Sequence, residues 1–477
     1  MAVVLVPLGA AGTFVPAGAQ EPAPADSSGF VGNWIGTLDV GAAQLRLRFV
    51  VAEGDDGLGA TLFSIDQGNA EIPVETVTTN GDTISMSMPL VGASYEGALS
   101  AEDGRISGTF TQAGVPFPLI LERAPDDEGE GTGPVRRPQD PEEPFPYLAE
   151  DVTFPNPGGG HTLAGTFTRP RSGGPFPAVV LISGSGPQDR DEALMGHRPF
   201  LVLSDHLTRR GIAVLRYDDR GVGESTGDFG SATTEDFATD ALAGVAYLKS
   251  RDDVDTGAIG LAGHSEGGLI APMAAVRSAD VSYIVLMAGT GVNGEQILYA
   301  QAALIARAAG ASEAAVAENR DRQRRIFEVL KEEADPGRAA EQITAAILPA
   351  EYDDLSDAAR DQVDAVVAAE VQRVNSPWFR FFLTHDPAKV IEEVTVPVLA
   401  INGKKDLQVP WEENLRAIEE ALQRGGNTRY EIHALPDLNH LFQRAETGAP
   451  SEYQAIEETW SPEAMELISD WILKVTG

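Results

Sequence analysis

Two hydrophobic patterns divide the chain. Residues 29–124 alternate apolar and polar side chains in short runs, and in one of them Ile84, Met86 and Met88 share a face. A period of two is typical of strands with one buried face. Turn signals such as the Asn-Gly-Asp at 80–82 separate the runs. This region predicts a small all-β barrel or sandwich, and we expect a lipocalin-like half-barrel.

From residue 147 onward, continuous apolar runs are separated by segments long enough for helices. Such runs predict the buried, mostly parallel strands of an α/β sheet. We expect an antiparallel pair first and then further strands, at 152–154 and 163–167, then 178–183, 212–217, 258–263, 283–288, 397–402 and 430–435. Thr233 and Asp236 predict a capping box at the start of one intervening helix.

The strands at 283–288 and 397–402 are separated by about a hundred residues of largely helical pattern. An insertion at this point commonly covers the active site of such a fold, so we expect a helical cap at about 292–385. Trp378 and Phe379 lie near its return to the sheet. Core packing is their simplest interpretation, and the alternative is that either ring lines the pocket for an acyl group.

Two further segments lie outside the predicted domains. Residues 125–146 are acidic and rich in Pro and Gly, which predicts a linker that cannot bury a core. Residues 1–19 are apolar and end in Ala-Gly-Ala, which predicts a signal peptide although a basic n-region is missing. We expect export to the periplasm or beyond the cell, and a cytoplasmic protein if this segment is not a signal.

The most informative motif is Gly263-His264-Ser265-Glu266-Gly267, between an apolar run and a helix-compatible stretch. Strand, sharp turn and helix in this order form a nucleophile elbow, which exposes the serine hydroxyl. Glycine is needed two residues before and two after the serine because a side chain there would collide with the strand or the helix. We predict Ser265 as the nucleophile and the backbone N–H of Glu266 as one oxyanion donor.

A second match to the G-x-S-x-G pattern occurs at 223–227. It follows a turn-rich loop, and no apolar strand leads directly into it. We therefore interpret Ser225 as a loop residue and not as the nucleophile.

A serine hydroxyl needs a base to take its proton, and in this fold the acid and then the histidine follow the serine. Asp406 comes just past the strand at 397–402, at the sheet edge where such folds keep their ligands. Beyond it, His440 lies on a loop and His433 lies inside the strand at 430–435. We predict His440 as general base and acid, and Asp406 as the group that holds its tautomer. Either residue alone would be read as an ordinary loop residue.

The oxyanion hole needs a second N–H donor. The apolar strand at 178–183 ends in Gly184-Ser185-Gly186, whose small side chains let the backbone approach a substrate closely. We predict the N–H of Ser185 as this donor, with Gly186 as the alternative; a plain tight turn is the simpler interpretation.

Three segments carry a family resemblance: Gly-Ser-Gly-Pro-Gln-Asp-Arg-Asp at 184–191, Arg-Tyr-Asp-Asp-Arg-Gly-Val-Gly-Glu-Ser at 216–225 and Gly-His-Ser-Glu-Gly-Gly at 263–268. They resemble bacterial α/β-hydrolase carboxylesterases, and the subgroup with an extra N-terminal β domain is the most similar. The resemblance covers nearly all of residues 28–477.

The resemblance implies hydrolysis of short-chain acyl esters through an acyl-enzyme, without a cofactor. It places the catalytic triad on Ser265, Asp406 and His440. It also implies that Asp219 and Arg220 brace the loops around the site.

Composition narrows the possible partners. The 72 acidic and 35 basic residues leave a net charge of −37, so nucleic acid and anionic membrane surfaces are poor partners. No cysteine is present, which excludes disulfides and cysteine-ligated zinc, and no His/Asp cluster has metal-binding spacing. Only six of the basic residues are lysine, which either a saline habitat or a GC-rich genome explains.

Function therefore has three candidates. A serine carboxylesterase acting on a small ester, with no membrane span, is the main prediction. A serine peptidase of the same fold and a non-catalytic binding protein on this scaffold are the alternatives. The β domain is expected to serve packing or dimerisation, which leaves a homo-oligomer open, or to bind a polymer or another ligand.

Overall fold

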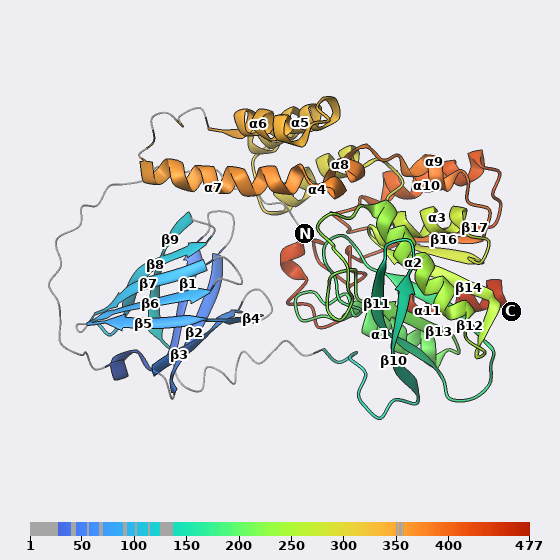
Figure 1. The fold of residues 1–477 in the computed structure, drawn as a ribbon, viewed down its shortest axis with the longest axis horizontal. Helices are drawn as coiled ribbons and strands as arrows, with labels where there is room; N and C mark the ends of the chain where they lie inside the picture. Colours follow the sequence, from blue (N-terminus) through green and yellow to red (C-terminus); the bar gives the residue numbers. More distant parts are fainter. Residues whose placement is uncertain are drawn as a thin grey trace. The chain divides into compact units, whose positions relative to one another are not determined.

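The computed structural model describes residues 27–39, 44–54, 57–65, 70–88, 93–100, 103–112, 115–124, 137–349, 352, 355 and 357–477. The expected signal peptide and residues 125–136 of the expected linker lie outside these ranges. The chain forms two compact units (Figure 1). One contains Arg137–Ala346 and Val371–Gly477, and the other contains the described part of Val4–Arg136 together with Ile347–Glu370.

The N-terminal unit is built on a nine-stranded antiparallel sheet in the order β4-β3-β2-β1-β9-β8-β7-β6-β5. The strands are β1 (Gly32–Asp39), β2 (Gln44–Gly54), β3 (Gly57–Ser64), β4 (Ala70–Pro73), β5 (Thr76–Asn80), β6 (Thr83–Met88), β7 (Ala93–Leu99), β8 (Ile106–Gln112) and β9 (Val115–Arg123). Burial alternates along β6, and Ile84, Met86 and Met88 are the buried residues, as the period of two predicts. The predicted all-β character is confirmed, and β3, β4 and β5 were not predicted.

The C-terminal unit contains an eight-stranded sheet in the order β10-β11-β13-β12-β14-β15-β16-β17. Its strands are β10 (Tyr147–Asn156), β11 (His161–Pro170), β12 (Phe176–Ile182), β13 (Ala213–Tyr217), β14 (Val254–His264), β15 (Tyr283–Met287), β16 (Val398–Gly403) and β17 (Tyr430–Leu435). β11 pairs antiparallel with β10 and β13, and the pairs from β13 to β17 are parallel. This is an α/β-hydrolase-type sheet, and the predicted strands are confirmed.

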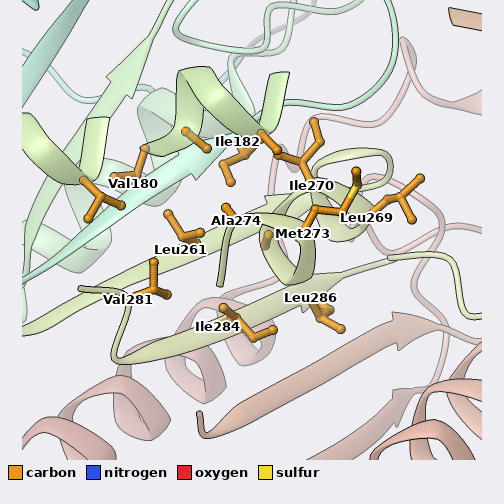
Figure 2. Close-up of a cluster of buried hydrophobic side chains, with 14 of the residues drawn as sticks. Val180, Ile182, Leu261, Leu269, Ile270, Met273, Ala274, Val281, Ile284 and Leu286 are labelled. Atoms are coloured by element: carbon orange, nitrogen blue, oxygen red, sulfur yellow. The ribbon is translucent and has the colours of Figure 1, made fainter. Parts of the chain in front are cut away.

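Two hydrophobic cores cover the two faces of this sheet, because successive strand residues point to opposite sides. Val180 and Ile182 of β12 face helices α2 (Thr234–Lys249), α3 (Gly267–Arg277), α9 (Pro387–Ile391) and α10 (Trp411–Arg424). Val179 and Leu181 face α1 (Pro199–Arg209) and α11 (Pro462–Thr476). Figure 2 shows α3 packed on the first of these faces, with Leu269, Ile270 and Met273 against the strands. The turn that carries Ser265 is therefore fixed by the sheet on one side and by the packed helix α3 on the other.

The segment between β15 and β16 is helical, as expected. Its helices are α4 (Gly294–Ala308), α5 (Glu313–Glu332), α6 (Pro336–Ile347), α7 (Asp357–Val374), α8 (Pro377–Thr384) and the short α9. Side chains of Asn293, Ser312 and Ser376 cap α4, α5 and α8 by accepting hydrogen bonds from backbone N–H groups. Across the described ranges, no helix is long and apolar enough to cross a bilayer.

The second half of the expected linker is anchored to the C-terminal unit. The Arg137 guanidinium donates hydrogen bonds to the carbonyl oxygens of Met195, Gly196, Gln454 and Ile456, at 3.0, 3.2, 2.9 and 2.7 Å. Burial lowers the pKa of this arginine, and nearby carboxylates oppose that shift. Composition did not predict this anchor because the acceptors are backbone carbonyls far along the chain.

Gln139 extends the anchor. Its side-chain amide donates to the carbonyl of Trp460 at 2.7 Å and accepts from the N–H groups of Thr459 and Trp460 at 2.6 and 3.0 Å. Both the N–H and the oxygen side of the amide are thus hydrogen-bonded to the backbone of residues 459–460. The anchored part of the chain begins at residue 137 and not at residue 147, where the first strand of the sheet begins.

Arg137→Ala tests this anchor. The substitution removes four hydrogen bonds to backbone carbonyls, three of them partly buried, so we expect the free energy of unfolding to fall by about 2–4 kcal/mol. Urea unfolding of the full chain measures the change. Arg416→Ala, at an exposed position on α10, is the control and should change stability by less than about 0.5 kcal/mol. Equal stability of the two variants would show that Arg137 does not anchor the segment.

Candidate active site

Ser265 lies on the sharp turn between β14 and α3. Its φ is 53°, a left-handed conformation that is strained for a residue with a side chain. The Ser265 N–H donates to the carbonyl of Met287 at 2.8 Å, which ties the turn to the neighbouring strand. A Cβ at Gly263 would overlap the carbonyl of Gly267, and a Cβ at Gly267 would overlap the carbonyl of Ile182. The steric reason for both glycines is therefore present in the structure.

Asp406 and His440 lie together at the carboxyl ends of β16 and β17. His440 Nδ1 lies 2.8 Å from Asp406 Oδ2, and both side chains are almost fully buried. The other oxygen, Asp406 Oδ1, accepts from the N–H groups of Gln408 and Val409 at 2.8 and 2.9 Å. These contacts fix the carboxylate, so His440 Nδ1 is the donor and Nε2 is the nitrogen that can act as a base.

The nucleophile and the histidine are adjacent but not hydrogen-bonded. The ring of His264, which directly precedes Ser265, lies 4.9 Å from the ring of His440. Within the described ranges, neither Ser265 Oγ nor His440 Nε2 makes a side-chain hydrogen bond. Such bonds are often long in a protein without substrate and tighten when the substrate binds. Both reactive atoms are thus available to each other or to a ligand.

The loop after β12 lies against the nucleophile. A Cβ built on Gly184 would lie 3.3 Å from Ser265 Cβ, so this backbone passes close to the reactive serine. The backbone N–H groups of Ser185 and Glu266 donate to no other atom in the part of the chain that the structure describes. The two predicted oxyanion donors are therefore both available for a ligand.

Asp219 braces the same loop, as the resemblance implies. Its carboxylate accepts from Ser183 Oγ and from the N–H of Gln188, each at 3.0 Å. Burial raises the pKa of Asp219 to about 8, although these hydrogen bonds oppose the shift. Arg220 is also structural, since its Nε donates to the buried carboxylate of Asp240 at 2.7 Å.

The side chain of Glu266 connects the elbow to α8. Its Oε1 accepts from Thr234 Oγ1 and from Trp378 Nε1, each at 2.7 Å. Burial raises the pKa of Glu266 to about 7. Trp378 therefore reaches the residue next to the nucleophile, whereas Phe379 is buried against Phe327 of α5, as its packing interpretation expects.

The two rejected candidates lie in other environments. Ser225 is buried; its Oγ donates to the carbonyl of Asp218 at 2.7 Å and accepts from the N–H of Ala164 at 2.9 Å. His433 is half-exposed in β17, and its Nε2 lies 3.4 Å from Glu431 Oε2. Neither residue contacts Asp406 or the elbow through a hydrogen bond.

Two residues at the site were not predicted, His264 and Glu192. His264 is the variable position before the serine in the motif, and Glu192 directly follows the segment 184–191 that carries part of the resemblance. His264 Nδ1 lies 2.9 Å from Glu192 Oε1. Both residues therefore lie next to motif residues in the sequence, but no sequence feature distinguished Glu192 from the many other acidic residues. In the described ranges, no group of three or more His, Asp or Glu side chains is placed to hold a metal ion.

Comparison with known proteins identifies the family of this chain. The pattern of the X-Pro dipeptidyl-peptidase (S15) family matches residues 111–435. The chain belongs to this family. Its matched region includes the elbow, Asp406 and β17, and it ends before His440, so family membership by itself does not assign the histidine.

A curated relative of this S15-family chain is Esterase EstD of Thermotoga maritima. The two are 28% identical over 312 residues, which is 65% of this chain and 64% of the relative, so the similarity spans slightly less than two thirds of that protein. Among solved structures, the chain is similar to the Pyrococcus furiosus esterase Pf2001, with 15% identity, a TM-score of 0.42 and coverage of 72% of this chain and 98% of that one. It is also similar to Est1E from Butyrivibrio proteoclasticus, with 19% identity, a TM-score of 0.38 and coverage of 68% and 98%.

Substituting the two late histidines tests the assignment of the base. His440→Ala should lower kcat about 10⁴-fold or more, because it removes the base that Asp406 orients beside Ser265. His433→Ala should leave kcat within about twofold, since that ring is half-exposed on β17. Steady-state kinetics on a soluble ester measures both. Near-normal turnover in His440→Ala would refute the assignment.

The pH dependence of stability tests the burial of Glu266. Its pKa rises from 4.5 to about 7 on folding, so the folded protein retains this proton where the unfolded chain has lost it. Ionisation therefore removes stability as pH rises from about 4.5 to above 7, by an amount on the order of 3 kcal/mol. Glu266→Gln keeps the acceptor for Trp378 but has no charge, so it should match the wild type at pH 5 and exceed its stability at pH 8.

Urea unfolding at both pH values measures this difference. Glu420→Gln, at an exposed position on α10, is the control and should show the same small difference from the wild type at pH 5 and pH 8. If Glu266→Gln is no more stable relative to the wild type at pH 8 than at pH 5, the carboxyl is not buried as the structure describes.

Proposed function

We propose that the protein is a serine carboxylesterase that hydrolyses short-chain acyl esters through an acyl-enzyme. The observation that carries this proposal is the pairing of His440 with Asp406 at 2.8 Å beside a strained Ser265 at the start of α3. The similarity to a protein named as an esterase supports ester substrates. Apart from the ester and water, the steps below use only groups of the chain itself.

In the first half of the reaction, Ser265 Oγ attacks the ester carbonyl carbon and His440 Nε2 takes its proton. The negative charge that develops on the carbonyl oxygen is stabilised by the N–H groups of Ser185 and Glu266. The carbon–oxygen bond to the alcohol then breaks, and the proton on His440 moves to the departing oxygen. Asp406 holds the Nδ1–H and stabilises the positive ring while it carries both protons.

In the second half, water replaces the alcohol. His440 takes a proton from the water as its oxygen attacks the acyl carbon, and the same two N–H groups stabilise the second oxyanion. The bond to Ser265 Oγ breaks, the proton returns from His440 to that oxygen, and the carboxylic acid leaves. Protons and bonds balance over the cycle, and the enzyme returns to its starting state.

We also propose that the helical segment of about 292–385 acts as a cap. Ile297 of α4 and Phe382 of α8 belong to the same hydrophobic core as the helices on that face of the sheet. Trp378 of α8 donates a hydrogen bond to Glu266, the residue that follows the nucleophile, and this contact supports the proposal. Trp378 is therefore the better candidate for a wall of the acyl pocket, and Phe379 supports it from behind.

The remaining proposals concern the rest of the chain. We propose that the nine-stranded sheet is a lipocalin-like half-barrel, supported by its continuous series of antiparallel neighbours and its apolar core. Export through the apolar N-terminal segment and assembly into a homo-oligomer are proposals from the sequence. Fractionation of the expressing cells and the mass of the purified protein in solution test them.

A serine peptidase is the second candidate, and the family match favours it. The matching pattern is that of X-Pro dipeptidyl-peptidases, which share the serine chemistry but cleave an amide. An amide has a poorer leaving group than an ester, so a site that cleaves it also cleaves activated esters. Only a comparison of the two substrate classes separates these functions.

The assay compares p-nitrophenyl acetate and butyrate with an Xaa-Pro p-nitroanilide. We expect the esters to be hydrolysed at least about 10³-fold more efficiently, as judged by kcat/KM. Ser265→Ala should lower kcat on the esters by roughly 10⁴–10⁶ without unfolding the protein. Ser225→Ala is the matched control; it should reduce stability by about 1–3 kcal/mol because its buried hydrogen bonds are lost, while the folded fraction keeps its turnover.

Efficient cleavage of the anilide would establish the peptidase instead. Turnover that survives Ser265→Ala, or that disappears in folded Ser225→Ala, would overturn the choice of nucleophile.

A further inference from the structure

A second histidine–carboxylate pair lies directly behind the elbow and takes no part in the steps above. Glu192 lies in the loop after β12, and its side chain is 6% exposed. Its Oε1 accepts from the N–H of Gly184 at 2.7 Å and faces His264 Nδ1 at 2.9 Å. The φ of Glu192 is 52°, a conformation that persists only where the surrounding structure enforces it. The carboxylate is therefore held in place for these two contacts.

The two nitrogens of His264 show how many protons the pair holds. Nε2 lies 2.9 Å from the carbonyl oxygen of His440, which can only accept, so Nε2 carries a hydrogen. Nδ1 faces a carboxylate oxygen, so a second hydrogen must lie between Nδ1 and Glu192 Oε1 for that contact to be attractive. The pair thus binds one proton in addition to the one on Nε2.

The charged groups around His264 stabilise its protonated form. Burial alone would lower the pKa of His264, but Glu192, the carbonyl of His440 and the carboxylate of Asp406 raise it above its ordinary value. The His440 ring also faces it, with the two ring centres 4.9 Å apart. The carboxylate of Glu192 balances the charge of His264, so no net positive charge lies beside His440 when that ring takes up a proton.

The contacts of this pair join three parts of the site that are distant in the sequence. Through Gly184, Glu192 fixes the backbone just before the proposed oxyanion donor Ser185. Through its main chain, His264 is continuous with Ser265, and through Nε2 it holds the backbone of His440. A shift of about 1 Å among these groups is enough to lower turnover about 100-fold.

We propose that Glu192 and His264 are positioning residues, which hold the oxyanion loop, the nucleophile and the general base in register through one shared proton. This inference rests on the proposed function. Loss of the shared proton leaves an Nδ1 lone pair facing a carboxylate, and the link between the loop and His440 is then repulsive. The pair therefore limits activity on the alkaline side.

Glu192→Gln is the first test, with kcat and KM for p-nitrophenyl butyrate measured from pH 5 to pH 10. We expect kcat at pH 8 to fall about 10- to 100-fold while KM changes less than about threefold, because the substrate does not touch this pair. The alkaline limb should move to lower pH, since a neutral amide no longer stabilises protonated His264. Glu192→Asp keeps the charge, and its alkaline limb should stay closer to that of the wild type.

His206→Asn is the matched control. This half-buried histidine of α1 lies 3.1 Å from Ser469 Oγ and touches neither the elbow nor the oxyanion loop. The control should lose some stability and keep the wild-type kcat and pH profile. If folded Glu192→Gln behaves like His206→Asn, the pair has only a structural role and the proposal is wrong.

Proton NMR keeps the proposal testable if Glu192→Gln does not fold. In the described ranges, the wild type should show low-field resonances from three buried histidine–carboxylate hydrogen bonds: His440 with Asp406, His264 with Glu192 and His161 with Asp240. His440→Ala should remove the first resonance and His161→Ala the third, and a resonance from His264 should remain in both variants. Loss of every such resonance in the variant that carries both substitutions would overturn the pairing.

The proposed function can fail separately. A wild type that turns over no ester, and whose Ser265 is not labelled by a fluorophosphonate, refutes the esterase while the NMR spectrum still decides the pairing. An active, labelled wild type combined with an unchanged kcat and pH profile in Glu192→Gln refutes the positioning role alone.

Discussion

The left-handed backbone at Ser265 is the constraint on which the site depends. A side-chain-bearing residue holds φ near 53° only if its neighbours over-determine it, and here β14, the carbonyl of Met287 and the packed helix α3 do so. The strain places the hydroxyl at the carboxyl edge of the sheet. The groups after β12, β16 and β17 then need only reach the same edge to meet it, which the parallel order of these strands ensures.

Buried carboxylates organise the loops at that edge. Asp219, Glu192, Asp406 and Glu266 each accept at least two hydrogen bonds, and at least one of these comes from another segment of the chain. A carboxylate offers two acceptor atoms in a small volume, so one side chain can join two loops that carry only donors. The acidic composition of the chain thus has a structural role inside the protein as well as at its surface.

The parts of this structure that followed from the sequence are those with local causes. Continuous apolar runs predicted β12 to β17, and the order of Ser265, Asp406 and His440 along the chain predicted which groups would meet. The strands β3 to β5 were missed because glycine and short length weaken their alternation. The Arg137 anchor and the role of Glu192 depend on partners far away in the sequence and, for Glu192, on a backbone conformation that the surrounding fold imposes. Local patterns carry no information about such contacts.

The two G-x-S-x-G segments use glycine for different physical reasons. Gly223 and Gly227 have φ of 54° and 113°, so they supply a backbone conformation, and the nearest atoms to an added Cβ there belong to side chains. Gly263 and Gly267 have ordinary φ, and an added Cβ would overlap main-chain carbonyls that cannot move aside. The same five-residue pattern therefore reflects two requirements: a left-handed backbone in the first segment, and contact between main-chain segments in the second. In the first segment a Cβ at Gly223 would also lie 2.6 Å from Asp218 Oδ2, whose carboxylate is held by Arg190 and by the N–H of Glu224. A side chain at Gly223 would thus displace a carboxylate, whereas a side chain at Gly263 or Gly267 would displace the main chain itself.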